Sequence, residues 1–227
     1  MRKRTTELVF IIDRSGSMHG LEADTIGGFN SMLEKQKNEE GHAYVSTVLF
    51  NDRSEVIHDR LNIKKVSPMT GRHYIPGGCT ALLDTVGDAI KHIGHIHKYS
   101  RKSDVPEKTL FVIITDGMEN ASHKYSAAQI KEMINRQQKK YGWEFIFLGA
   151  NIDAVAAAED IGISEDRAVK FCCDEAGTEL NYKTIDRAVS SFRQCASLPA
   201  DWKDDIDLAK QNQLYHNLPS KVYNRLS

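Results

Sequence analysis

Two acidic and three hydroxyl residues stand at positions where they could bind a metal ion together. Asp13, Ser15 and Ser17 form a D-x-S-x-S pattern directly after an apolar run. Thr80 follows the Gly-Gly-Cys stretch of a later loop, and Asp116 follows a second apolar run. Carboxylate and hydroxyl oxygens are hard donors, which Mg²⁺ prefers in octahedral geometry. We therefore expect a Mg²⁺-type site built from these five residues.

The mixture of donors in this set suggests a way of binding a partner. Two carboxylates roughly cancel the charge of a divalent ion. If the hydroxyls bind the ion directly and the carboxylates act partly through water, the ion stays electrophilic. Such an ion favours an anionic sixth ligand, for example a Glu or Asp side chain of another protein. This remains a hypothesis at the level of sequence.

Short, continuous apolar runs are typical of strands that are buried on both faces. The sequence predicts strands at 8–12, 44–50, 110–114, 145–148 and 168–171, and a returning antiparallel strand at 55–59. Candidate metal ligands follow the predicted strands at 8–12 and 110–114. In a parallel sheet ligands collect beyond the carboxyl ends of the strands, which is where these residues would lie.

Segments with helical spacing of apolar residues alternate with the strands. We expect helices over 21–38, from about Ala81, around Ile130–Ile134, over 155–161 and around Ile185–Phe192. This alternation favours an α/β fold with a mostly parallel sheet covered on both faces. Residues 196–227 lack the regularity, and we interpret them as a C-terminal extension that docks loosely or forms short helices.

Composition narrows the classes of function. Apolar residues make up 41% and charged residues 27% of the 227 residues, which fits a globular protein with a real core. The formal net charge of -1 argues against a nucleic-acid binder that works by bulk electrostatics. The first apolar run ends at Asp13 and has no cleavage pattern, so we expect no signal peptide, no membrane segment and a cytoplasmic protein.

The four cysteines, Cys79, Cys172, Cys173 and Cys195, contain no CxxC pair. We expect reduced thiols and no zinc site. The histidines at 92, 95 and 97 are interpreted as a solvated helix face. The two tryptophans are expected to pack in the core rather than to form a ligand box.

The three separated motifs resemble the metal-ion-dependent adhesion site of the von Willebrand factor A domain family. The resemblance covers residues 5–195. Within the family, the sequence is more similar to bacterial intracellular members than to secreted adhesion domains. It implies a Rossmann-like, doubly wound sheet of six strands in the order 3-2-1-4-5-6, with one antiparallel edge strand. It also implies binding of Mg²⁺ or Mn²⁺ and recognition of a protein ligand that presents Asp or Glu. Ser15, Ser17 and Thr80 would then be hydroxyl ligands, and Asp13 and Asp116 direct or water-mediated ligands.

Further residues near the predicted site are candidates for a rim that contacts a partner. They are Arg14, Met18, Cys79, Glu119, Asn120, Asn151 and Asp153. For Glu119, Asn120 and Asp153 the alternative is that they cap the helix that follows each of them.

Two alternative functions compete with metal-dependent protein binding. A phosphatase of the haloacid dehalogenase type would need a second Asp two residues after Asp13, and that position is Ser15. The sequence also lacks a G-x-S-x-G elbow and a Walker motif, so we expect no enzyme activity. The other alternative is an ion that only stabilises the loops.

Overall fold

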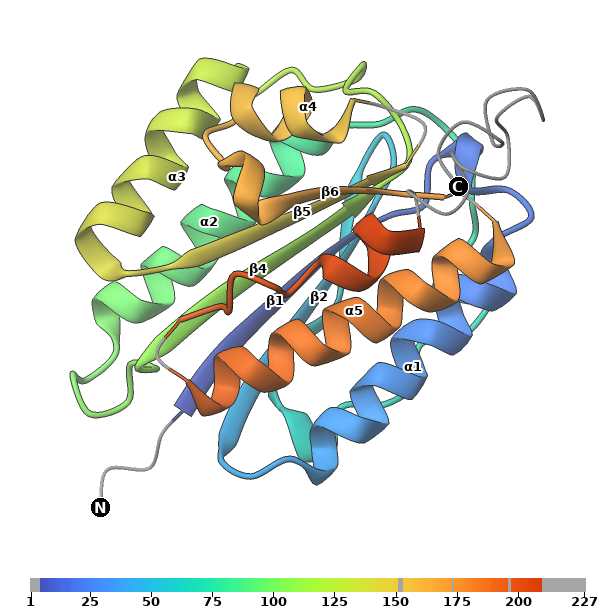
Figure 1. The fold of residues 1–227 in the computed structure, drawn as a ribbon. Coiled ribbons are helices and arrows are strands. Elements are labelled where there is room, and N and C mark those ends of the chain that lie inside the picture. Colours follow the sequence, from blue (N-terminus) through green and yellow to red (C-terminus); the bar gives the residue numbers. More distant parts are fainter. Residues whose placement is uncertain (1–4, 151–152, 173, 196, 210–227) are drawn as a thin grey trace, which may run out of the picture.

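The computed structural model describes residues 5–150, 153–172, 174–195 and 197–209. They form a six-stranded sheet with the strand order β3-β2-β1-β4-β5-β6 (Figure 1). Only β3 is antiparallel to its neighbour. The predicted α/β class, strand order and antiparallel edge strand are therefore confirmed. The strands are β1 (Thr5–Asp13), β2 (His42–Phe50), β3 (Ser54–Asn62), β4 (Lys108–Thr115), β5 (Glu144–Ala150) and β6 (Ala168–Phe171).

Helices cover both faces of the sheet (Figure 1). One face is covered by α1 and α5, which pack against each other, and the other by α2, α3 and α4. The helices are α1 (Glu22–Asn38), α2 (Leu82–Tyr99), α3 (Ala127–Tyr141), α4 (Ala154–Asp160) and α5 (Glu175–Gln194). Short 3-10 turns lie at η1 (Gly16–Met18), η2 (Ile63–Lys65) and η3 (Glu165–Arg167).

The alternation of side chains along β1 explains why its apolar run is unbroken. Leu8, Phe10 and Ile12 point to the core under α1 and α5, whereas Val9 and Ile11 point to the core under α2 and α3. Both faces of a central parallel strand are buried, so neither set can be polar. The register pairs Ile12 with Ile114 in β4, which brings the carboxyl ends of β1 and β4 side by side.

Residues 197–209 pack on the domain through buried apolar side chains. Leu198, Trp202 and Ile206 are at most 4% exposed and belong to the core under α1 and α5. The indole of Trp202 also donates a 2.8 Å hydrogen bond to the carbonyl of Asp166. Of the two sequence-based alternatives, loose docking is wrong for this stretch, because its apolar residues are buried, and helical turns are present at 204–209.

The histidines on α2 differ in their surroundings. His92 is exposed, as expected, and its Nε2 lies 2.8 Å from a carboxylate oxygen of Asp59. His97 is only 10% exposed, and its Nε2 lies 3.2 Å from Oε2 of the fully buried Glu7. The prediction of a solvated face is therefore wrong for His97, because a buried carboxylate on β1 draws it inward.

Trp143 and Trp202 are both core residues, as predicted. Cys79 and Cys195 are exposed free thiols, and Cys173 lies outside the described residues. No helix in the described part of the chain is both long and apolar enough to span a bilayer.

Candidate metal centre

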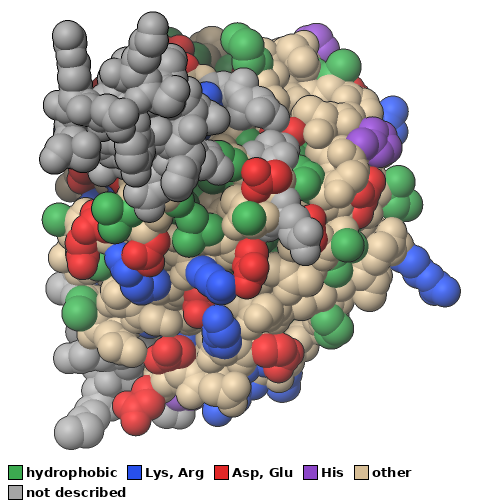
Figure 2. Space-filling view, turned by 45° about the vertical axis from the view of Figure 1, so that its right-hand side comes forward, with side chains coloured by type: hydrophobic (Ala, Val, Ile, Leu, Met, Phe, Trp, Pro, Cys, Tyr) green, Lys and Arg blue, Asp and Glu red, His purple; other side chains and the backbone are tan. Residues whose placement is uncertain are grey.

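Three loops meet at the carboxyl ends of β1 and β4. The first follows β1, the second precedes α2 and the third follows β4. The first two are joined by hydrogen bonds from Gly16 N to Gly78 O (3.1 Å) and from Gly77 N to Arg14 O (3.0 Å). Figure 2 turns this end of the molecule forward, and its visible charges are interspersed rather than gathered by sign. The hydrogen bonds make the first two loops one structural unit.

Asp13 is the buried anchor of the first loop. Its Oδ1 accepts a 2.7 Å hydrogen bond from Ser15 N, and its Oδ2 accepts one of 2.6 Å from Thr115 Oγ1. Burial raises the pKa of this carboxyl above its usual value, against the lowering effect of these hydrogen bonds, and the nearby Asp116 raises it further. Because both oxygens are already engaged, Asp13 is suited to orient the loop and to act on an ion through water.

The three hydroxyls converge on one place. Ser15 Oγ and Ser17 Oγ lie 3.1 Å apart, and Ser17 Oγ donates a 2.5 Å hydrogen bond to Asp116 Oδ1. A methyl group on Gly117 would lie 2.8 Å from Thr80 Oγ1, 3.5 Å from Ser17 Oγ and 3.6 Å from Ser15 Oγ. A side chain at position 117 would therefore push the Thr80 hydroxyl away from the two serine hydroxyls.

This arrangement fits a hard divalent cation. Asp13, Ser15, Thr80 and Asp116 are at most 3% exposed, whereas Ser17 is exposed and opens the site to solvent. No three His, Cys, Asp or Glu side chains gather within the described ranges in a way that could hold a metal. The donor set here is instead hydroxyls with two carboxylates, which suits Mg²⁺ or Mn²⁺ rather than a softer metal.

The loop that carries Thr80 is fixed from two sides. Thr80 N donates to Asn120 Oδ1 (2.9 Å), and Asn120 N donates to Thr80 O (3.1 Å). Cys79 N donates to Asp52 Oδ1 (2.9 Å). Gly78 adopts a φ of +77°, and any side chain there would overlap the carboxylate of Asp52. The position of Thr80 is thus set by hydrogen bonds with the loop after β4 and with the turn between β2 and β3.

Glu119 braces the third loop against α2. Its carboxylate accepts hydrogen bonds from Leu83 N (2.8 Å), Ala121 N (2.9 Å), Ser122 N (2.8 Å) and Ser122 Oγ (2.8 Å). Leu83 lies in the first turn of α2, whose N–H groups have no partner within the helix. The sequence suggested a cap on the following helix; the carboxylate instead caps the preceding one.

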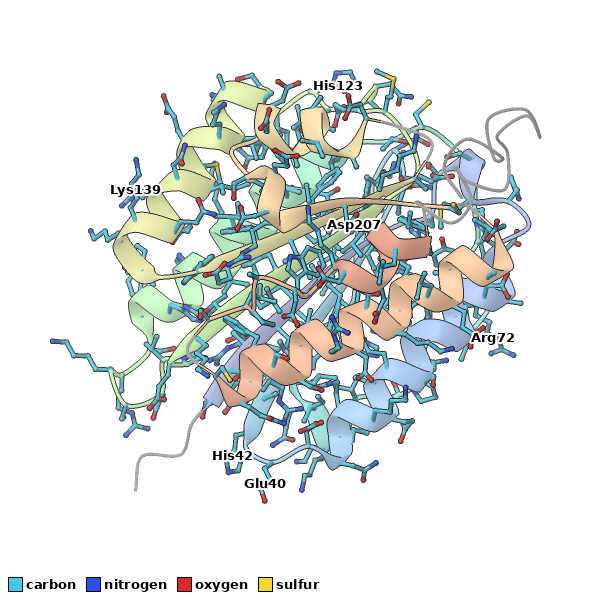
Figure 3. The ribbon with its side chains drawn as sticks, in the orientation of Figure 1. Glu40, His42, Arg72, His123, Lys139 and Asp207 are labelled. Carbon is cyan, nitrogen blue, oxygen red and sulfur yellow. The ribbon has the colours of Figure 1, made fainter. Side chains whose placement is uncertain are left out.

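Asp84 on α2 holds the same loop from the other side. Its carboxylate accepts backbone hydrogen bonds from His123, Lys124 and Tyr125 at 2.8–3.1 Å. Partial desolvation raises the pKa of Asp84, but these donors and the charge of Lys124 outweigh it, and the pKa is lowered overall. Figure 3 labels His123 on this loop.

The predicted rim residues have different roles in the structure. Met18 is 3% exposed and packs in the core, so its placement on the rim is wrong. Arg14 forms a 2.7 Å ion pair with Glu55 and donates to the carbonyl of His73, so its charge is already partnered. Cys79 is exposed beside Thr80.

On the far side of the site, the Asp153 side chain accepts from Ala156 N (3.1 Å) and caps α4, which is the alternative that the sequence offered. Asn151 lies outside the described residues.

Sequence reasoning missed two exposed apolar residues in these loops. Met118 follows Gly117 directly and is 74% exposed. Ile75 is 64% exposed and lies between Tyr74, whose hydroxyl donates to Asp13 O, and the loop of Gly77. The available signal was an apolar side chain in a Gly-rich or acidic loop, where no strand or helix would bury it.

Comparisons with known proteins bear on the fold. No family model matches the chain, and no curated protein does. Among solved structures, a von Willebrand factor type A protein from Catenulispora acidiphila aligns with a TM-score of 0.54 at 12% identity, over 82% of this chain and 43% of that one. The ArnB paralog VWA2 from Sulfolobus acidocaldarius gives a TM-score of 0.52 at 14% identity, over 80% of this chain and 44% of that one.

A third similar structure is the manganese-loaded TRAP protein of Plasmodium vivax. Its TM-score is 0.52 at 16% identity, over 79% of this chain and 73% of that one. The chain spans less than half the length of the Catenulispora and Sulfolobus proteins. With the strand order and helix layers described above, these likenesses show that this chain has the fold of a von Willebrand factor A domain.

Proposed function

We propose that this chain is a divalent-metal-dependent protein-binding module with a complete metal-ion-dependent adhesion site. Mg²⁺ or Mn²⁺ would be held by the hydroxyls of Ser15, Ser17 and Thr80, with Asp13 and Asp116 as direct or water-mediated ligands. The observation that carries the proposal is the convergence of these hydroxyls, from the loop after β1 and the loop before α2, on Gly117 in the loop after β4. The manganese in the TRAP structure belongs to that protein and adds only analogy.

The state of the carboxylates favours recognition of an acidic partner. Both oxygens of Asp13 accept hydrogen bonds from the protein, and Oδ1 of Asp116 accepts one from Ser17. Neutral hydroxyls would then dominate the inner ligands of the ion, which keeps it electrophilic. An Asp or Glu of a partner supplies the missing anionic ligand through the side left open at Ser17.

The residues around the site are suited to contact with the surface of a partner protein. Met118 and Ile75 are exposed apolar residues in the loops that build the site. Apolar groups around a polar centre give a partner buried area, while the ion gives specificity. The partner would therefore present its acidic residue next to apolar side chains.

A binding role is proposed rather than catalysis. A hydrolase would need a free base beside the metal to activate water. Glu119, the acidic residue nearest to Asp116 in sequence, already accepts four hydrogen bonds. We place the protein in the cytoplasm of a bacterium, as a module of a larger assembly.

The test is capture of partners by the immobilised chain from an extract of its native cell. We expect a defined set of proteins to be retained with Mg²⁺ and released by a chelator. A Thr80→Val variant keeps the side-chain shape but loses one hydroxyl and should retain none of them. Ser31→Ala, on the exposed side of α1, is the matched control and should behave as wild type. Retention of the same proteins in chelator and by Thr80→Val would refute the proposal.

A further inference from the structure

A cavity lies between α2 and α3, away from the candidate metal centre. Its lining includes Thr109, at the beginning of β4, and Tyr141, at the end of α3. The metal centre is at the opposite, carboxyl end of the strands. In Figure 1 α2 and α3 lie side by side, and Lys139, labelled in Figure 3, marks the turn of α3 at this end. The cavity volume is about 660 Å³, within the range of small-molecule sites.

The inner wall of this cavity is apolar and aromatic. Trp143 is 5% exposed, and its ring stacks on Phe111 with 5.3 Å between the centroids. Ile90 and Met133 complete this wall from α2 and α3. A flat aromatic or acyl group would bury its surface here against rigid side chains.

The mouth of the cavity is positively charged. Lys91, Lys98 and Arg136 line it, against the single carboxylate of Glu107. The two lysine ammonium groups lie over tyrosine rings, at 4.6 Å from the ring centre of Tyr125 and 5.1 Å from that of Tyr99. Within the part of the chain that the structure describes, neither lysine forms an ion pair with a carboxylate.

Arg136 is the strongest anion-binding candidate. Its guanidinium has no hydrogen-bond or ion-pair partner among the residues that the structure describes. His97 also lines the cavity, but its Nε2 is 3.2 Å from Glu7 and its ring packs on Trp143, so it is already engaged. A planar guanidinium matches the two oxygens of a carboxylate.

We propose that this cavity binds a small amphipathic organic acid, with an aromatic or acyl body against Trp143 and a carboxylate at Arg136. The inference does not depend on the metal centre. Nothing in the proposed partner binding uses these residues, so either proposal can fail alone.

Gly94 offers a way to close the cavity. A Cβ at this position would be in ordinary contact with Gln137 Nε2 at 3.8 Å and Trp143 at 3.9 Å, without overlap. Gly94→Leu should therefore fill the space between the helices while the fold remains. Gly27→Leu, on α1, is the matched control, because a Cβ there meets nothing within 4 Å.

The experiment is calorimetric titration of the full chain with 2-naphthoate, with its neutral amide 2-naphthamide and with acetate. We expect naphthoate to bind in a ratio of one to one, the amide and the Arg136→Gln variant to bind at least about tenfold more weakly, and acetate not to bind. Gly94→Leu should lose naphthoate binding, while Gly27→Leu keeps it.

Four results would overturn the proposal: no naphthoate binding by the wild type, equal binding of acid and amide, unchanged binding by Arg136→Gln, or unchanged binding by Gly94→Leu. Circular dichroism of Gly94→Leu checks that loss of binding is not loss of fold. If that variant does not fold, the Arg136→Gln comparison decides, because residue 136 is on the surface.

Discussion

Ser17 Oγ donates a 2.5 Å hydrogen bond to Asp116 Oδ1, joining two loops that lie 99 residues apart in sequence. The donor follows β1 and the acceptor follows β4, and these strands are neighbours in the sheet. The contact thus depends on the strand order, because Ser17 and Asp116 can meet only when β1 and β4 are neighbours.

Gly117→Ala should remove metal binding without unfolding the protein. The added methyl would press on Thr80 Oγ1 at 2.8 Å and displace it from the other hydroxyls. In the wild type, Mg²⁺ at a hundredfold excess over its Kd should add about 2.7 kcal/mol to the free energy of unfolding. Thermal melts with Mg²⁺ and with chelator should show this shift in the wild type and in Gly27→Ala, but not in Gly117→Ala. An equal shift in Gly117→Ala would show that the ion binds elsewhere.

Most of the fold follows from local sequence patterns. The apolar runs of β1 and β4 and the spacing in α2 predicted the elements, and the positions of Asp13 and Asp116 predicted which loops meet. Convergence of the five side chains is observed, and metal binding by them stays a prediction.

The features that the sequence did not reveal depend on contacts between distant segments. Glu119 caps α2 rather than the following helix, because the loop folds back on Leu83. His97 turns inward because Glu7, on β1, is buried beside it. Residues 197–209 pack closely rather than loosely because they return to the sheet edge, where the Trp202 indole donates to the carbonyl of Asp166. None of these contacts has a period or motif that could be found before the strands are assembled.

Glu119→Ala should destabilise the protein, because four donors lose their acceptor. An unsatisfied buried donor costs about 1–3 kcal/mol, so we expect a loss in that range in urea unfolding. Met118→Ala, one residue away, removes only an exposed side chain and should leave the free energy of unfolding unchanged while weakening partner capture. If Glu119→Ala unfolds like the wild type but fails to capture partners, Glu119 belongs to the rim after all.

The free energy of unfolding should decrease as the pH falls below neutrality, because of His58. Burial lowers the pKa of this histidine in the folded state, and its Nδ1 lies 3.0 Å from Thr47 Oγ1. The unfolded chain, with a histidine pKa of about 6.5, then binds more protons than the folded one. The contribution of His58 to the free energy of unfolding is complete above the pKa of the unfolded state. It is lost as the pH falls toward the lowered pKa of the folded state.

The slope from His58 is at most about 1.4 kcal/mol per pH unit. Urea unfolding at a series of pH values should show a shallower decline for His58→Gln than for the wild type. His42→Gln, at an exposed position, is the control substitution. Parallel curves for all three proteins would show that His58 titrates alike in both states.

Trp202→Ala should be strongly destabilising, although it lies beyond the last strand and α5. Its side chain is fully buried, and removing such a group costs about 3–5 kcal/mol. Leu208→Ala, in the same segment but 55% exposed, should cost little. Denaturant midpoints of both variants measure the difference. A small effect of Trp202→Ala would mean that the segment contributes little to the core.

The central claim is that hydroxyls and carboxylates from three loops hold one hard divalent ion, and a Mn²⁺ titration followed by electron paramagnetic resonance tests it most directly. The account predicts that the wild type binds one Mn²⁺ per chain, that Mg²⁺ displaces it, and that Ser15→Ala/Ser17→Ala binds none while keeping the circular dichroism of the wild type. Undiminished Mn²⁺ binding by that double variant, or no binding by the wild type, would contradict it.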